Sequence, residues 1–112
     1  MSEVAAEKIA SRLAELWQSS RPTILERMAV LHATGEALGT NPLDRQARDR
    51  GREAAHKLSG VLGIFGLPQG SEIAFTLEEQ LKSAAPFLPD DLLSLRTRIA
   101  ELDAVIASKS AP

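Results

Sequence analysis

The chain has 112 residues, no cysteine, two histidines and a net charge of −2. This length suits one small domain with a hydrophobic core. The lack of cysteine excludes disulfides, thiolate metal sites and cysteine nucleophiles. With two histidines, a histidine-rich zinc site is not expected. The weak negative net charge gives no basis for nucleic-acid binding. The sequence has neither an apolar run long enough to span a membrane nor a signal peptide. We therefore expect a cytoplasmic protein without membrane partners.

Two amphipathic segments lie before the first loop and are separated by Pro22. The first covers about 3–17 with Ser2 as its N-cap, and the second runs from Pro22 to about Leu38, where Gly39 provides a stop. Their apolar residues recur at helical spacing: Ala5, Ile9, Leu13 and Leu16 in the first, and Ile24, Met28, Leu31, Gly35 and Leu38 in the second. Because proline breaks a helix interior but is tolerated at a helix start, the pattern predicts two separate helices.

Three further helices are predicted over about 43–65, 69–84 and 90–107, with Gly66 and Pro68 ending the first of them. The residues expected to face inward on the helix over 43–65 are Ala47, Gly51, Ala54, Leu58, Leu62 and Phe65. On the helix over 69–84 they are Ile73, Ala74, Leu77 and Leu81. On the helix over 90–107 they are Leu92, Leu95, Ile99, Leu102 and Ile106. Residues 108–112 are expected to form a frayed tail.

The pattern as a whole predicts an all-α protein, because no segment alternates with period two over the length of a strand. Each helix has one apolar stripe to bury, and the connections are short. We therefore expect a single domain over 1–112, an antiparallel up-and-down four-helix bundle with an additional N-terminal helix. No exposed heptad seam indicates a dimer, so a monomer is expected.

His56 is the candidate functional residue of the helix predicted over 43–65. At 100° per residue it lies almost opposite the core residue Leu58, so its imidazole should face water. Residues three, four and seven positions away share its face: Arg52, Glu53, Ser59, Gly60 and Gly63.

Gly60 and Gly63 are unusual inside a helix, because each costs about 1 kcal/mol relative to alanine. Without a Cβ at either position, the surface of another protein can approach the imidazole closely. A neutral imidazole is a nucleophile that could accept a phosphoryl group from a partner. The chain has no phosphate-binding loop of its own, so the partner would have to supply the metal and the acidic site.

The segment from Ala55 to Gly66, AHKLSGVLGIFG, resembles the signature of histidine-containing phosphotransfer (HPt) domains. The positions that follow also fit the resemblance, namely Ser71, Ala74, Leu77 and Glu78. The resemblance is strongest over 52–82, and the bundle plan extends it to nearly the whole chain. It implies a four-helix bundle that shuttles phosphoryl groups in bacterial two-component phosphorelays, with no turnover of its own.

Carried over onto this sequence, the resemblance makes His56 the phosphoacceptor, reacting through Nε2. Gly60 matches the glycine that opens the surface, and Glu78 matches a position that can hold Nδ1–H. The sequence departs from the family at Ser59, where a lysine usually assists with the phosphoryl charge. Arg52 is the best substitute cation on the same face.

Lys57 is the next substitute cation, about 100° further round the helix. The implied partners are response-regulator receiver domains, a sensor histidine kinase, or both. The resemblance implies no cofactor on this chain, with Mg²⁺ held by the receiver. Ile64 and Glu53 are candidate docking residues, although Ile64 could equally be a neutral surface residue.

Four arginines before His56 are interleaved with acidic residues: Arg45, Arg48, Arg50 and Arg52. A solvated, salt-bridged face is the simpler interpretation, and docking to an acidic partner is the alternative. His32 is interpreted as structural, and Trp17 as a core or end-cap residue. The sequence from Gly66 to Gly70 is interpreted as a turn between helices.

Two other functions remain open. A helical module that binds signalling partners without being phosphorylated is favoured by the absence of a lysine at Ser59. The chain could also be the phosphoacceptor module of a chemotaxis-type kinase, which would need a separate catalytic domain. The identity of the phosphoryl donor separates these alternatives.

Overall fold

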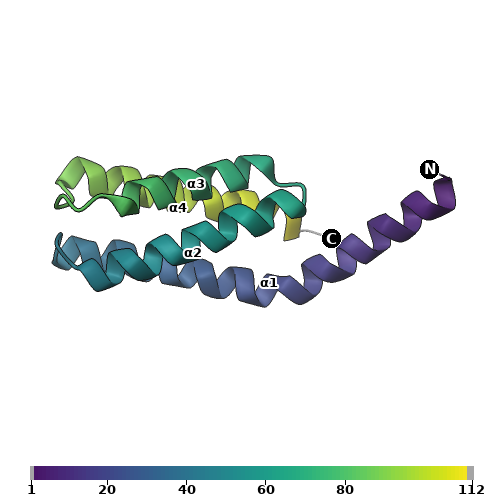
Figure 1. Ribbon diagram of the computed structural model, residues 1–112, viewed down its shortest axis with the longest axis horizontal. Helices are drawn as coiled ribbons and strands as arrows, with labels where there is room; N and C mark the ends of the chain where they lie inside the picture. Colours follow the sequence, from purple (N-terminus) through teal and green to yellow (C-terminus); the bar gives the residue numbers. More distant parts are fainter. Residues whose placement is uncertain (1, 111–112) are drawn as a thin grey trace.

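The computed structural model describes residues 2–110, which form four helices (Figure 1). These are α1 (Glu3–Thr40), α2 (Arg45–Ile64), α3 (Pro68–Lys82) and α4 (Pro89–Ser110), and the described residues contain no strand. Each helix packs against two others, in the ring α1–α2–α3–α4. The predicted all-α, antiparallel four-helix bundle is therefore confirmed.

The core of the bundle consists of the apolar stripes that face its axis. Its fully buried large side chains come from all four helices: Ile24, Leu31, Leu38, Leu58, Leu62, Leu77, Leu95, Ile99 and Leu102. All of them lie on stripes predicted from the sequence. Burying each of these side chains stabilises the fold by about 1.5–3 kcal/mol relative to leaving it in water.

The additional N-terminal helix predicted from the sequence is wrong, because α1 is continuous from Glu3 to Thr40 with Pro22 inside it. The exposed proline ring removes one backbone hydrogen bond, and α1 changes direction between its purple and blue parts (Figure 1). Buried side chains anchor the helix on both sides of the proline, Trp17 before it and Ile24 after it. Their packing offsets the roughly 3 kcal/mol that an interior proline costs.

The apolar stripe of the first half of α1 is exposed, contrary to the expectation that it is buried. Ile9 is 49% exposed and Leu13 is 40% exposed. The bundle ends at Trp17, whose ring meets Phe65 edge-on at a centroid distance of 5.3 Å and lies under Lys109. The residues before Trp17 extend beyond the bundle, as Figure 1 shows. Trp17 is thus a buried residue at the end of the bundle, as predicted.

Side chains cap the N-terminal ends of α1 and α2, the first of them Ser2 as predicted. Ser2 Oγ accepts the N–H of Ala5 at 3.2 Å, and Asp44 accepts that of Ala47 at 3.0 Å. The end of α2 is closed by Gly66, which has φ of +73° and lies in a Schellman-type turn. At the other end of the chain, α4 continues to Ser110, so the expected tail is helical that far, and residues 111–112 lie outside the described part.

Close packing of α1 on α2 fixes the orientation of α2. A Cβ added at Gly51 would lie 2.6 Å from Thr34 Oγ1, closer than real side chains approach. Only glycine allows the two helices to approach so closely at this position. Because the Gly51 side of α2 faces α1, the opposite side of α2 faces solvent. Within residues 2–110, no helix has the length and apolarity needed to cross a membrane.

Candidate functional site

His56 lies on the solvent side of α2, as its helical position predicts. Ala54, Ala55 and Leu58 are buried on the core side of the same helix. The His56 side chain is 72% exposed. Its imidazole is therefore open to a partner protein.

Glu78 of α3 orients the imidazole. Its side chain is only 11% exposed, and Oε2 lies 2.9 Å from His56 Nδ1. A carboxylate can only accept a hydrogen bond, so Nδ1 carries the proton and donates it to Glu78. In the neutral imidazole this leaves the Nε2 lone pair on the solvent side. The structure thus brings together the two residues that the resemblance paired.

The surface beside His56 is bare at Gly60, one turn further along α2. Apart from the backbone of its own helix, a Cβ built at Gly60 meets no atom of the described residues within 4 Å. No contact within the described chain therefore explains a residue that weakens the helix. Gly63 lies one further turn away and borders Ser71 of α3, whose hydroxyl donates to the Ser59 carbonyl oxygen at 2.6 Å.

The charged side chains near His56 differ in whether they form ion pairs. Lys57 forms an ion pair with Glu53 at 2.9 Å. The hydrogen bond from Lys57 and its charge lower the pKa of the Glu53 carboxyl. Arg52 borders the same depression of about 500 Å³ as His56 and Glu78, and it forms no ion pair within the described residues. Among the described residues of this site, Arg52 is therefore a cation without an ion-pair partner, whereas Lys57 is paired and Ser59 carries no charge.

Two large apolar side chains are exposed on α2 and α3, the helices that carry His56 and Glu78. Ile64, a predicted docking candidate, is 69% exposed at the end of α2. Phe75 of α3 is 53% exposed and was missed by the sequence analysis. It lies one helical turn before Glu78, outside the stripe formed by Ala74 and Leu77. An aromatic residue off the inward stripe was the signal that could have identified it.

The interpretation of the four arginines as one solvated, salt-bridged face is wrong for Arg48. Arg48 is 5% exposed, it donates to the carbonyl oxygens of Ser83, Ala85 and Pro42, and its guanidinium lies 4.5 Å from the centroid of the Phe87 ring. Burial lowers its pKa from the usual arginine value. No ion pair joins the other three arginines to acidic neighbours within residues 2–110.

His32 lies far from His56 and joins α1 to α4. Its Nε2 is 2.7 Å from Asp103 Oδ2, and its side chain is 55% exposed. The pair bridges the two helices at the surface, which agrees with a structural role.

Comparison with known proteins identifies the family to which the chain belongs. The family model described as Hpt domain matches residues 7–105. Protein RcaC of Microchaete diplosiphon is 34% identical over 90 residues, which are 80% of this chain and 14% of that protein. The chain therefore spans a small part of the length of this relative. No solved structure matches the chain significantly. The match over most of its length shows that the chain belongs to the family of Hpt domains, the phosphocarrier modules of two-component phosphorelays.

Proposed function

We propose that the chain carries phosphoryl groups on His56, accepting them from an aspartate of one receiver domain and passing them to another. The observation that supports this best is the hydrogen bond between Nδ1 and Glu78, which leaves Nε2 as the exposed nucleophile. The bare surface at Gly60 supports close approach of the donor.

In the proposed transfer, the Nε2 lone pair attacks the phosphorus of an aspartyl phosphate. A new N–P bond forms, the P–O bond breaks, and its electron pair stays on the departing carboxylate. The imidazole becomes positively charged because Nδ1 keeps its proton, and Glu78 balances this charge. In the second transfer, an aspartate oxygen of the next receiver attacks phosphorus, and the N–P electron pair returns to Nε2.

We further propose that this chain needs no metal of its own. A receiver would hold Mg²⁺ beside its aspartate and neutralise the charge of the phosphoryl group from its side. On this chain, Arg52 would supply positive charge in the place that lysine usually serves in the family.

The test is phosphoryl transfer from a panel of radiolabelled phosphorylated receivers to wild type and to His56→Gln. Glutamine keeps an N–H donor for Glu78 but is not a nucleophile, so the variant should fold and remain unlabelled. Wild type should gain an acid-labile, alkali-stable label. If only an ATP-loaded kinase labels wild type, the donor is a kinase and the proposed receiver-to-receiver direction is wrong.

A second candidate function is a helical module that binds signalling partners without being phosphorylated. It is favoured by Ser59, since a hydroxyl brings no charge to a phosphoryl group. If neither protein is labelled while a control HPt domain is, this second function replaces the first. The bare surface at Gly60 would then serve docking alone.

Arg52→Ala should slow phosphoryl transfer about 10-fold at saturating partner, equivalent to about 1.4 kcal/mol of lost transition-state stabilisation. The reason is loss of the one cation without an ion pair among the described residues that line the His56 depression. Arg50→Ala is the matched control, because Arg50 is exposed on another side of α2. Single-turnover rates should show a partial recovery in Arg52→Lys. Equal rates for Arg52→Ala and Arg50→Ala would contradict the assignment.

A further inference from the structure

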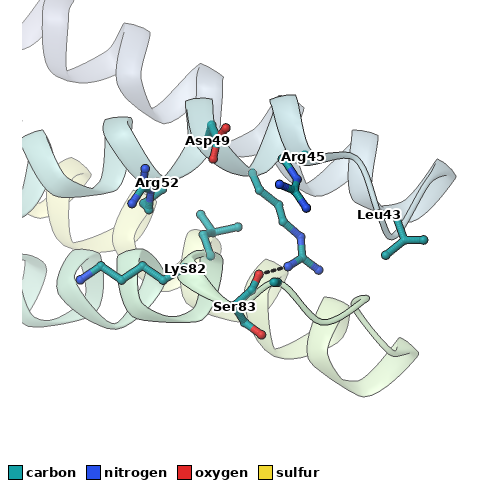
Figure 2. Close-up of a pocket in the computed structure, with 9 residues that line it drawn as sticks. Leu43, Arg45, Asp49, Arg52, Lys82 and Ser83 are labelled. Carbon is teal, nitrogen blue, oxygen red and sulfur yellow. Dashed lines mark hydrogen bonds between the residues drawn. The ribbon is translucent and has the colours of Figure 1, made fainter.

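A second groove lies between α2 and the C-terminal end of α3 (Figure 2). Its volume is about 400 Å³. Arg45, Asp49 and Arg52 face it from α2, and Lys82 faces it from α3. The proposed phosphoryl chemistry uses only Arg52 among these residues, so the rest of the groove has no assigned role.

The side chains that line the groove include four cations, Arg45, Arg48, Arg52 and Lys82, and one carboxylate, Asp49. Lys82 pairs with Glu79 at 2.7 Å, whereas Arg45 and Arg52 have no ion pair within the described residues. The pKa of Lys82 is raised, mainly by its hydrogen bond with Glu79; the charge of Glu78 adds to this effect and the charge of Arg52 opposes it. In a protein of net charge −2, this is a local positive surface that an anionic partner would stabilise.

The wall of the groove is held in place by the buried guanidinium of Arg48. It donates to the carbonyl oxygens of Ser83 and Ala85 after α3 and to that of Pro42 before α2. The dashed line in Figure 2 marks the bond to Ser83. These contacts tie the two loops at this end of the bundle together, so the groove exists before any partner arrives.

The charges of the groove are spread out rather than focused on one point. Arg45 and Arg52 are seven residues apart, which is roughly 10 Å along the helix, and Asp49 lies between them on the groove. A single phosphate would meet the Asp49 carboxylate together with one arginine. An extended segment with more than one carboxylate can instead pair with the cations on both sides of Asp49.

The position of the groove indicates where that segment comes from. Arg52 borders both this groove and the depression that contains His56. Arg45 lies eleven residues before His56, roughly 16 Å along α2. A partner interface of about 800 Å² per side, centred on His56, would extend over this distance.

We propose that this groove binds an acidic segment on the rim of the protein that exchanges phosphoryl groups with His56, and that it speeds their encounter. The inference rests on the proposed function, because the partner is the one that reaches His56. Arg45 and Lys82 act in docking only and do not touch the phosphoryl group.

The experiment measures transfer from the receiver that labels wild type, over a range of receiver and salt concentrations. Arg45→Glu should lower the second-order rate constant about 10-fold at low salt, because a reversed rim charge slows association. The first-order rate at saturating receiver should stay within about twofold of wild type, since this charge is absent from the reacting centre. Lys82→Gln should lower the second-order rate constant by about threefold.

Arg50→Glu is the matched control, because it makes the same charge change at an exposed position on another side of α2. It should stay close to wild type, and at high salt Arg45→Glu should converge on the control as the charges are screened. If wild type is labelled but Arg45→Glu and Arg50→Glu behave alike, the inference alone is wrong. If no receiver labels wild type, the proposed function fails and the inference fails with it.

A free anion is the competing occupant of the groove. Titration with inorganic phosphate, followed by amide chemical shifts, should give only weak changes that chloride at equal ionic strength reproduces. Saturable, phosphate-specific shifts at Arg45 and Lys82 that disappear in Arg45→Glu would assign the groove to a small anion and overturn the proposal.

Discussion

Gly60→Leu is expected to slow phosphoryl transfer by about 100-fold, equivalent to about 2.7 kcal/mol, without loss of folding stability. Outside the backbone of its own helix, no atom of the described residues lies within 4 Å of a Cβ added at this exposed position, so we expect the isolated chain to accommodate the new side chain. Replacing a helical glycine also stabilises the helix by up to about 1 kcal/mol. The leucine would project beside His56 into the space that a partner must occupy.

Measuring the transfer rate and the thermal unfolding of the same variant separates the effect on partner docking from the effect on folding stability. Ala100→Leu is the control, because it adds the same side chain at an exposed position of α4. Its transfer rate should remain near that of wild type. If Gly60→Leu transfers as fast as this control, close docking at Gly60 is excluded.

Glu78→Ala is expected to slow transfer by about 10- to 100-fold, because hydrogen bonds to charged groups contribute about 1.5–3 kcal/mol. Without the carboxylate, Nδ1 loses its acceptor, the ring is free to rotate, and the positive charge of the phosphorylated imidazole is unbalanced. Glu78→Gln keeps an acceptor oxygen without the charge, so its rate should lie between those of Glu78→Ala and wild type.

Glu79→Ala is the control for this series, because Glu79 is exposed and pairs with Lys82 rather than with His56. The variants are compared at saturating partner, where docking through Lys82 does not limit the rate. NMR spectra of the ring nitrogens should show mixed tautomers in Glu78→Ala and a single Nδ1–H tautomer in wild type. A transfer rate in Glu78→Ala equal to that of Glu79→Ala would contradict the positioning role.

The bundle itself was predictable because its helices are strongly periodic. The stripes through Leu58, Leu77 and Ile99 identified buried faces correctly, and the angular position of His56 followed from them. The contact between His56 and Glu78 came from the resemblance and not from periodicity. Periodicity places residues within one helix but cannot align two helices.

The errors arose where tertiary packing overrides a local signal. Pro22 is a strong helix breaker in isolation, yet packing of Trp17 and Ile24 on both sides keeps α1 continuous. Arginine is usually a surface residue, but Arg48 is buried because the loop after α3, which is distant in sequence, supplies two of its carbonyl acceptors, those of Ser83 and Ala85. Neither arrangement leaves a pattern in the nearby sequence.

The exposed apolar stripe of α1 also shows what helical periodicity cannot predict. Ile9 and Leu13 have the spacing of a buried helix face, but α2 and α4 end before they reach this part of α1. An amphipathic pattern predicts that a helix has an apolar face. It does not predict which element, if any, covers that face.

The most direct test of the account is to locate the phosphoryl group on the chain after transfer. Peptide mapping under alkaline conditions should place it on His56, and phosphorus–nitrogen coupling in the NMR spectrum of labelled protein should place it on Nε2. Phosphorylation of Nδ1, of His32 or of another residue would contradict the role assigned to Glu78 and the account built on it.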